Sequence, residues 1–148
     1  MKPKLNCVLV IDDDEATNFF NYMIIEKSGC TDHIKVIQTG QDALDYLSNS
    51  IRIKNREDDF PCPELIFLDI NMPAMNGWEF IEKFRKLEKG QKGKIVMVML
   101  TTSLFPEDVI IAKEVPEISC FENKPLTADK LNSILKKHFP GYLSEKHI

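Results

Sequence analysis

Residues 64–77, with the sequence ELIFLDINMPAMNG, form the stretch that decides the fold. Four consecutive apolar residues at 65–68 are typical of a short strand that is buried on both faces of a parallel sheet. Asp69 follows directly, and a turn rich in Pro, Asn and Gly comes after it. Ligands of open parallel sheets bind beyond the carboxyl ends of the strands, so we expect Asp69 at a binding site. A lone aspartate at this point can also serve only to cap a turn, and the rest of the chain must decide between the two roles.

The composition is that of one globular domain. The chain has 148 residues, of which 43% are hydrophobic and 28% charged, and this length is enough to bury a core without added cross-links. The formal net charge of -4, with acidic and basic residues interleaved, argues against a nucleic-acid-binding surface. The first apolar run, 7–11, is too short for a signal peptide or a membrane helix. We therefore expect a cytoplasmic protein that binds neither nucleic acid nor membrane.

Short apolar runs alternate with helical patterns along the whole chain. The first helical pattern places Ala16, Phe19, Phe20, Met23 and Ile24 on the face expected to meet the core. Right-handed crossovers between such elements give a five-stranded parallel sheet that is doubly wound by five helices, a flavodoxin-like α/β fold. The predicted strands are 5–11, 33–38, 65–68, 95–100 and 117–121, and the predicted helices are 16–28, 39–47, 76–87, 106–114 and 127–138.

Polar residues follow four of the predicted strands. Asp12 and Asp13 follow the first, Asp69 the third, Thr101 the fourth and Lys124 the fifth. If these strands are neighbours, their polar ends gather in one crevice. Carboxylate oxygens suit Mg²⁺, lysine and threonine can hold phosphoryl oxygens, and a carboxylate can itself attack phosphorus to form an aspartyl phosphate. The set therefore predicts Mg²⁺-assisted phosphoryl chemistry, although an ion-pair network that only holds the strand ends together would use the same residues.

Four segments taken together resemble the receiver domain of two-component response regulators. They are VLVIDDDE at 8–15, LIFLDINMPAMNG at 65–77, VMVMLTTS at 96–103 and FENKP at 121–125, and the resemblance spans residues 5–139. It implies that Asp69 is the phosphoacceptor and takes its phosphoryl group from a sensor histidine kinase or a histidine phosphotransfer protein. The chain would then be a signalling domain that assists its own phosphorylation and dephosphorylation, like a chemotaxis regulator, rather than a classical enzyme.

The same resemblance implies a Mg²⁺ site. Asp13 would bind the ion directly, and Asp12 would bind it directly or through water. Asp69 and the backbone carbonyl of Asn71 would complete the protein ligands.

The remaining motif residues acquire roles from the resemblance as well. Thr101 and Lys124 would each contact a phosphoryl oxygen, and Pro125 would follow the lysine through a cis peptide bond. Phe121 occupies the aromatic switch position, where an inward movement of Thr101 would let it change the surface of the last two helices. An ordinary core aromatic is the alternative role for Phe121.

Two other functions are compatible with parts of the pattern. A haloacid-dehalogenase-like phosphatase uses a D-x-D pair after its first strand, which Asp12 and Asp14 match, but that reading leaves Asp69 unexplained and lacks a later acidic pair. Asp14 can instead act as the N-cap of the first helix. An adaptor that uses the fold only for binding would not need the phosphorylation residues at all.

The chain departs from most receivers in two places. The segment 48–63 is a longer loop than receivers usually carry there, and only the tail 140–148 follows the last helix. We expect one stand-alone receiver domain over 1–148 that signals through contacts with an unidentified downstream protein, as a monomer or a phosphorylation-linked dimer. Phe105, Ile110 and Ile111 near the fourth helix are candidate contact residues, with core packing as the alternative for at least one of them. By the resemblance, Asn71 and Ser103 lie where receivers control dephosphorylation by admitting or blocking the attacking water.

Overall fold

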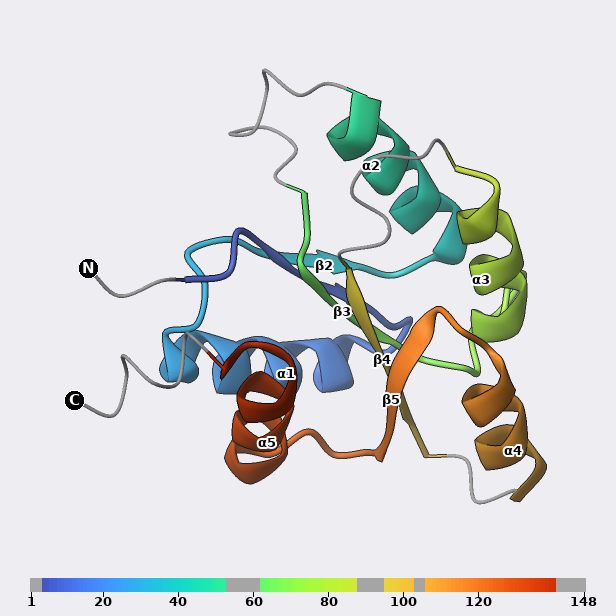
Figure 1. The fold of residues 1–148 in the computed structure, drawn as a ribbon. Helices are drawn as coiled ribbons and strands as arrows, with labels where there is room; N and C mark the ends of the chain where they lie inside the picture. The colour runs from blue at the N-terminus through green and yellow to red at the C-terminus, as the bar shows by residue number, and fades with distance from the viewer. Residues whose placement is uncertain (1–3, 53–61, 88–94, 103–105, 141–148) are drawn as a thin grey trace.

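The computed structural model describes residues 4–52, 62–87, 95–102 and 106–140, and these form one five-stranded parallel sheet with helices on both faces (Figure 1). The strand order is β2-β1-β3-β4-β5, which confirms the predicted doubly wound α/β fold. The strands are β1 Val8–Ile11, β2 Ile34–Ile37, β3 Leu65–Leu68, β4 Val96–Thr101 and β5 Ile118–Asn123. The helices are α1 Glu15–Ser28, α2 Gly40–Arg52, α3 Gly77–Arg85, α4 Pro106–Glu114 and α5 Ala128–His138.

Alternation of side chains along the strands produces two separate cores. Leu9 in β1 faces a cluster that contains Leu44 of α2 and the completely buried Phe80 of α3. Val10, the next residue of β1, faces the opposite cluster with Ile25 of α1, together with residues of α5. Each side chain of a central strand is therefore covered by helices, as the uninterrupted apolar runs predict.

Strand register brings the ends of the central strands to one level. Ile11, the last residue of β1, pairs with Leu68, the last residue of β3, and the backbone amide of Asp69 donates a 3.0 Å hydrogen bond to the carbonyl oxygen of Ile11. At the other side of the sheet Thr101 pairs with Asn123. The residues that follow these strands thus leave the sheet at the same edge.

Helix starts follow the capping residues in the sequence. The side chain of Asn76 accepts a hydrogen bond from the backbone amide of Glu79 at 2.9 Å, and the carboxylate of Glu79 accepts one from the backbone amide of Asn76 at 3.1 Å, which completes a capping box at α3. Thr39 caps α2, and Asp14 caps α1 through the amide of Thr17 at 2.9 Å. The predicted capping role of Asp14 is confirmed.

The predicted buried face of α1 is wrong except for Ile24, which packs partly against the core. Phe19 is 67% exposed, and Phe20 and Met23 are exposed as well, whereas Asn18 and Ile25 are buried. Apolar residues occupy several sides of this helix, so their spacing does not define one face. The position of α1 over the sheet decides instead, and it turns the line through Asn18, Asn21 and Ile25 inward.

Some predicted boundaries also shift. The loop predicted from residue 48 begins later, because α2 continues to Arg52, and β5 continues past Phe121 to Asn123. The first strand is shorter than predicted, with Leu5 forming only an isolated bridge to Thr31. Residues 53–61 of the long loop, 141–148 of the tail, Ser103 and Phe105 lie outside the described residues. No helix among the described residues is both long and apolar enough to cross a membrane.

Candidate functional site

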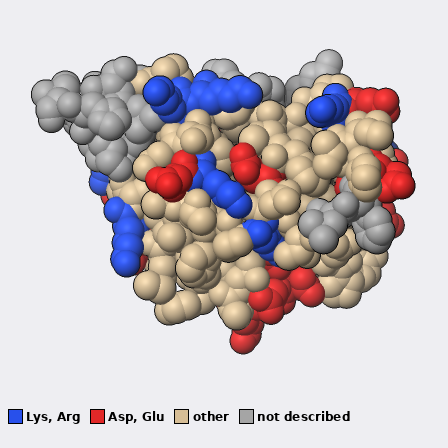
Figure 2. Space-filling view, turned by 90° about the horizontal axis from the view of Figure 1, so that it is seen from below, with Lys and Arg blue, Asp and Glu red and all other residues tan. Residues whose placement is uncertain are grey.

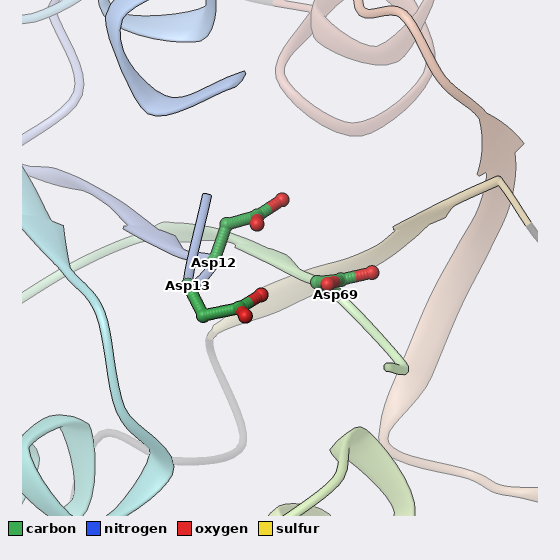
Figure 3. Close-up of side chains that lie close together, drawn as sticks. All are labelled: Asp12, Asp13 and Asp69. Atoms are coloured by element: carbon green, nitrogen blue, oxygen red, sulfur yellow. The ribbon is translucent and has the colours of Figure 1, made fainter. Parts of the chain in front are cut away.

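Three carboxylates meet where β1 and β3 end. Figure 3 shows Asp12 and Asp13 at the end of β1 and Asp69 beside them at the end of β3. One oxygen from each side chain lies within 4.8 Å of the others. Asp12 and Asp69 are only 2% and 5% exposed, whereas Asp13 faces solvent. Two buried acids beside a third create a concentration of negative charge that needs a cation to balance it.

Lys124, which directly follows the edge strand β5, supplies part of the balancing positive charge. Its Nζ lies 2.6 Å from Oδ2 of Asp12 and 3.4 Å from Oδ1 of Asp69. Burial disfavours the charged ammonium, but the hydrogen bond to Asp12 and the charges of Asp12 and Asp69 outweigh burial and raise the pKa of Lys124 above its ordinary value. The lysine therefore stays protonated and keeps both acids within its reach.

Asp69 is less readily ionised than an ordinary aspartate. Its burial, followed by the charge of Asp12, raises its pKa from 3.8 to about 6. The charge of Lys124 and a hydrogen bond from the backbone amide of Asn71 act in the opposite direction without cancelling the effect. At neutral pH Asp69 is mainly ionised and is held in an unfavourable environment, which a bound cation or the loss of its charge would relieve.

The donor set fits a divalent metal ion. Carboxylate oxygens and backbone carbonyl oxygens are ligands that Mg²⁺ and Mn²⁺ accept. Asp12, Asp13 and Asp69 offer three carboxylate oxygens that lie close together. Lys124 brings one positive charge to a cluster of three carboxyl groups, and it contacts only Asp12 and Asp69. The backbone carbonyl of Asn71 as a further ligand stays a prediction.

The other predicted site residues lie at the end of β4, in β5 and directly after β5. Thr101 is fully buried at the end of β4, and its carbonyl oxygen accepts a 2.8 Å hydrogen bond from the amide of Lys124. The peptide bond between Lys124 and Pro125 is cis. Phe121 is half-buried and lines a surface cleft of about 480 Å³ between α4, β5 and α5, together with Val109. The structure thus brings Lys124 into contact with Asp12 and Asp69. Phe121 lies in β5, where it packs partly against the core and also lines the cleft beside α4 and α5, so both of its predicted roles stay open.

Two residues that the sequence did not single out support this site. Asn18 of α1 donates a hydrogen bond from Nδ2 to the backbone carbonyl of Asp12 at 2.7 Å, which holds the end of β1. Gly77 is required because a Cβ atom there would lie 2.8 Å from the carbonyl oxygen of Asp69 and 2.9 Å from Cα of Ile70. Two asparagines three positions apart, Asn18 and Asn21, among the aromatic and aliphatic residues of α1 were the available signal for Asn18.

Asp14 does not belong to the acidic cluster. Its carboxylate accepts hydrogen bonds from the side chain and the amide of Thr17, and these lower its pKa. The D-x-D pattern that suggested a haloacid-dehalogenase-like phosphatase therefore has its second aspartate engaged as a helix cap.

The model of the response regulator receiver domain family matches residues 8–136. This chain belongs to that family. A two-component response regulator from Cytophaga hutchinsonii has a similar structure, with a TM-score of 0.80 and 34% sequence identity over 93% of this chain and 98% of that one. Response regulator Rcp1 from Synechocystis is 26% identical over 79% of this receiver and 75% of its own length. The hybrid signal transduction histidine kinase L of Dictyostelium discoideum is 29% identical over 90% of this receiver, which spans only 7% of that kinase.

Membership in this family carries general properties. Receiver domains are signalling domains that accept phosphoryl groups from histidine kinases, and they bind a divalent metal ion. A structure of Rcp1 in its Mn²⁺-bound form has the same fold, with a TM-score of 0.65 and 24% identity. The acidic cluster of this receiver, Asp12, Asp13 and Asp69, fits such an ion.

Proposed function

We propose that this receiver accepts a phosphoryl group on Asp69, with Mg²⁺ as its metal, from a histidine kinase or a histidine phosphotransfer protein. The observation that carries the proposal is the contact of one buried ammonium, Lys124, with both Asp12 and Asp69 at the acidic cluster. A carboxylate nucleophile needs a cation that can also hold the incoming phosphoryl oxygens. Few structural roles require that combination at the end of a buried strand.

In the proposed transfer, a carboxylate oxygen of Asp69 forms a bond to phosphorus while the bond from phosphorus to the donor's nitrogen breaks. The leaving imidazole keeps the electron pair and takes up a proton. Asp69 acts as its carboxylate, which predominates above its pKa of about 6. Mg²⁺ held by Asp12, Asp13, Asp69 and the carbonyl of Asn71 would supply charge neutralisation at the phosphoryl oxygens.

The ammonium of Lys124 would pair with one phosphoryl oxygen, because the carboxylate of Asp69 that it now contacts would carry the phosphoryl group. The buried hydroxyl of Thr101 is proposed to bond a second phosphoryl oxygen. We propose that the resulting movement of Thr101 changes the position of Phe121 and so the surface of α4, β5 and α5. Ile110 and Ile111, which are 57% and 41% exposed on α4, would then belong to the surface that a downstream protein reads.

The proposed setting is the cytoplasm, with protein partners rather than nucleic acid. In the view of Figure 2, Lys and Arg are interspersed with Asp and Glu, which is not the pattern of a nucleic-acid-binding face. Whether the phosphorylated form is a monomer or a dimer is testable by light scattering with and without the phosphodonor.

Intact-protein mass spectrometry tests the phosphoacceptor. Incubation with phosphoramidate or acetyl phosphate should add one phosphoryl group, about 80 Da, only when Mg²⁺ is present. Asp69→Asn should abolish the gain, and Asp13→Asn should slow it. Asp45→Asn, a matched change on the exposed side of α2, should behave as the wild type. Uptake by Asp69→Asn at the wild-type rate would show that the phosphoacceptor lies elsewhere, and the absence of uptake by the wild type from both donors would favour an adaptor function.

A further inference from the structure

The side chain of Lys130, in the first turn of α5, reaches back to the segment that carries Lys124. Its ammonium donates a 2.7 Å hydrogen bond to the backbone carbonyl oxygen of Asn123 and a 3.0 Å hydrogen bond to that of Pro125. These carbonyls belong to the residues immediately before and after Lys124. One ammonium on a helix therefore bridges the two chain neighbours of the lysine that contacts the acidic cluster.

Little packing supports this segment. Asn123 and Pro125 are both exposed, so neither side chain is anchored in the core. Before Pro125, the backbone amide of Lys124 donates to the carbonyl oxygen of Thr101 at 2.8 Å, and after it Leu126 is fully buried. The two hydrogen bonds from the α5 lysine fix the backbone between these anchors.

The residue type at position 130 departs from what the helix itself favours. Thr127 is the N-cap of α5, and its side chain accepts a 3.1 Å hydrogen bond from the backbone amide of Lys130. Glu or Gln at this position would complete a capping box, as Glu79 does at α3. A positive charge in the first turn is also unfavourable, because the N-terminal end of a helix carries a partial positive charge. None of the ion pairs among the described residues gives Lys130 an acidic partner.

The carbonyl oxygens of Asn123 and Pro125 explain why a lysine stands there. An ammonium offers three N–H donors, so one lysine side chain can serve both oxygens at once. Because the donor is charged, such hydrogen bonds are stronger than neutral ones. A glutamate could bond neither oxygen, because a carboxylate can only accept. Lysine is therefore favoured by the neighbours of Lys124 and not by α5, and local rules of this kind are broken mainly at functional sites.

We propose that Lys130 is a positioning residue for Lys124. By bridging the carbonyls of Asn123 and Pro125, it fixes the backbone from which the Lys124 ammonium reaches the acidic cluster. This role rests on the proposed phosphoryl transfer, in which that ammonium pairs with a phosphoryl oxygen. Lys130 acts only through Lys124, since no ion pair among the described residues joins it to the acids of the cluster.

Lys130→Gln tests this role, because glutamine removes the ammonium and can complete the capping box. The midpoint of urea unfolding should therefore equal that of the wild type or rise slightly. Phosphorylation by phosphoramidate at saturating Mg²⁺ should slow by about tenfold, since displacing a reacting group by 1 Å can cost about a hundredfold. The Mg²⁺ affinity, measured by titration calorimetry, should stay at the wild-type value, because the carboxylates of the cluster keep their places.

Two further variants serve as controls. Lys130→Arg keeps a charged side chain with several N–H donors, so it should restore most of the wild-type phosphorylation rate. Lys136→Gln removes the same charge from an exposed position in the last turn of α5, and it should be phosphorylated as the wild type is. A general effect of charge on the phosphodonor would instead slow both glutamine variants alike.

The order of the Lys124 ammonium provides a measurement that does not need phosphoryl transfer. ¹⁵N relaxation of Lys124 Nζ in the metal-free protein should show a rigid ammonium in the wild type and in Lys130→Arg, and a mobile one in Lys130→Gln. If that difference is found but the wild type takes up no phosphoryl group, the proposed function fails and the positioning of Lys124 stands.

Three results would overturn the proposal. The first is phosphorylation of Lys130→Gln at the wild-type rate, and the second is a Lys124 ammonium as rigid in Lys130→Gln as in the wild type. The third is a slower rate that is accompanied by a lower midpoint of urea unfolding, because Lys130 would then only stabilise the start of α5.

Discussion

Replacing Asp69 by asparagine should make the metal-free protein more stable at neutral pH, although it removes the proposed phosphoacceptor. Asp69 is buried beside Asp12, and its pKa is raised from 3.8 to about 6. Between these two pH values the native state binds more protons than the unfolded state, so native stability falls as pH rises. Above pH 6 the carboxylate is ionised in both states, and the full cost of ionising it in the fold is present.

The magnitude follows from the size of the pKa difference. A difference of about two pH units at 1.36 kcal/mol per unit gives about 3 kcal/mol at pH 7.5. At pH 4.5 the native carboxyl is mostly protonated, and the cost falls to about 1 kcal/mol. Asparagine has no charge to bury, and Lys124 keeps its 2.6 Å contact with Asp12 in the variant. The variant should therefore exceed the wild type by up to about 3 kcal/mol at pH 7.5 and by about 1 kcal/mol at pH 4.5.

Urea unfolding in EDTA at the two pH values measures this difference. Asp45→Asn makes the same chemical change at an exposed position and should alter the free energy of unfolding by less than about 0.5 kcal/mol. Adding Mg²⁺ should stabilise the wild type and reduce the advantage of Asp69→Asn, because a bound cation relieves the same repulsion. The reasoning is refuted if the variant is no more stable than the wild type at pH 7.5, or if its advantage is the same at both pH values.

Three further changes test the packing around the site by urea unfolding. Lys124→Met should destabilise the metal-free protein by about 3 kcal/mol, because two buried carboxylates lose their ammonium partner. Mg²⁺ should restore part of that stability, and an unchanged stability of the variant would contradict the ion-pair geometry. Gly77→Ala should cost about 1 to 3 kcal/mol, because its Cβ would press on rigid backbone. Gly40→Ala should cost less, because its Cβ meets the side chain of Met75, which can shift more easily than backbone; the reverse order would contradict this account. Phe19→Ser should change stability by less than about 0.5 kcal/mol, whereas Ile25→Ala should cost about 2 to 5 kcal/mol; a large loss at Phe19 would show that the predicted core face of α1 was right.

Local sequence pattern was sufficient for the elements of the fold. The apolar run 65–68 predicts β3 with its observed bounds, and Pro106–Glu114 matches α4. These predictions succeed because a strand buried on both faces needs an uninterrupted apolar run, whatever surrounds it. Asn76 likewise predicts the start of α3, since a capping box is completed by residues three positions apart.

The candidate site was predictable only as a set of residues. Polar residues at the ends of successive strands could be read from the chain, and the parallel topology made their convergence an expectation. The contact of Lys124 with Asp12 joins residues 112 positions apart, and it depends on β1, β3, β4 and β5 being neighbours in that order. No local pattern contains that information.

By itself, the sequence determined the order of strands and helices, their caps and the residue types at the strand ends, because each depends on neighbours a few positions away. Tertiary structure alone decided which side of α1 is buried and how far the pKa of Asp69 is raised. Each of these depends on what another element places beside the residue. A helix with apolar residues on several sides can bury any of these sides, and its packing against the sheet determines which one is buried.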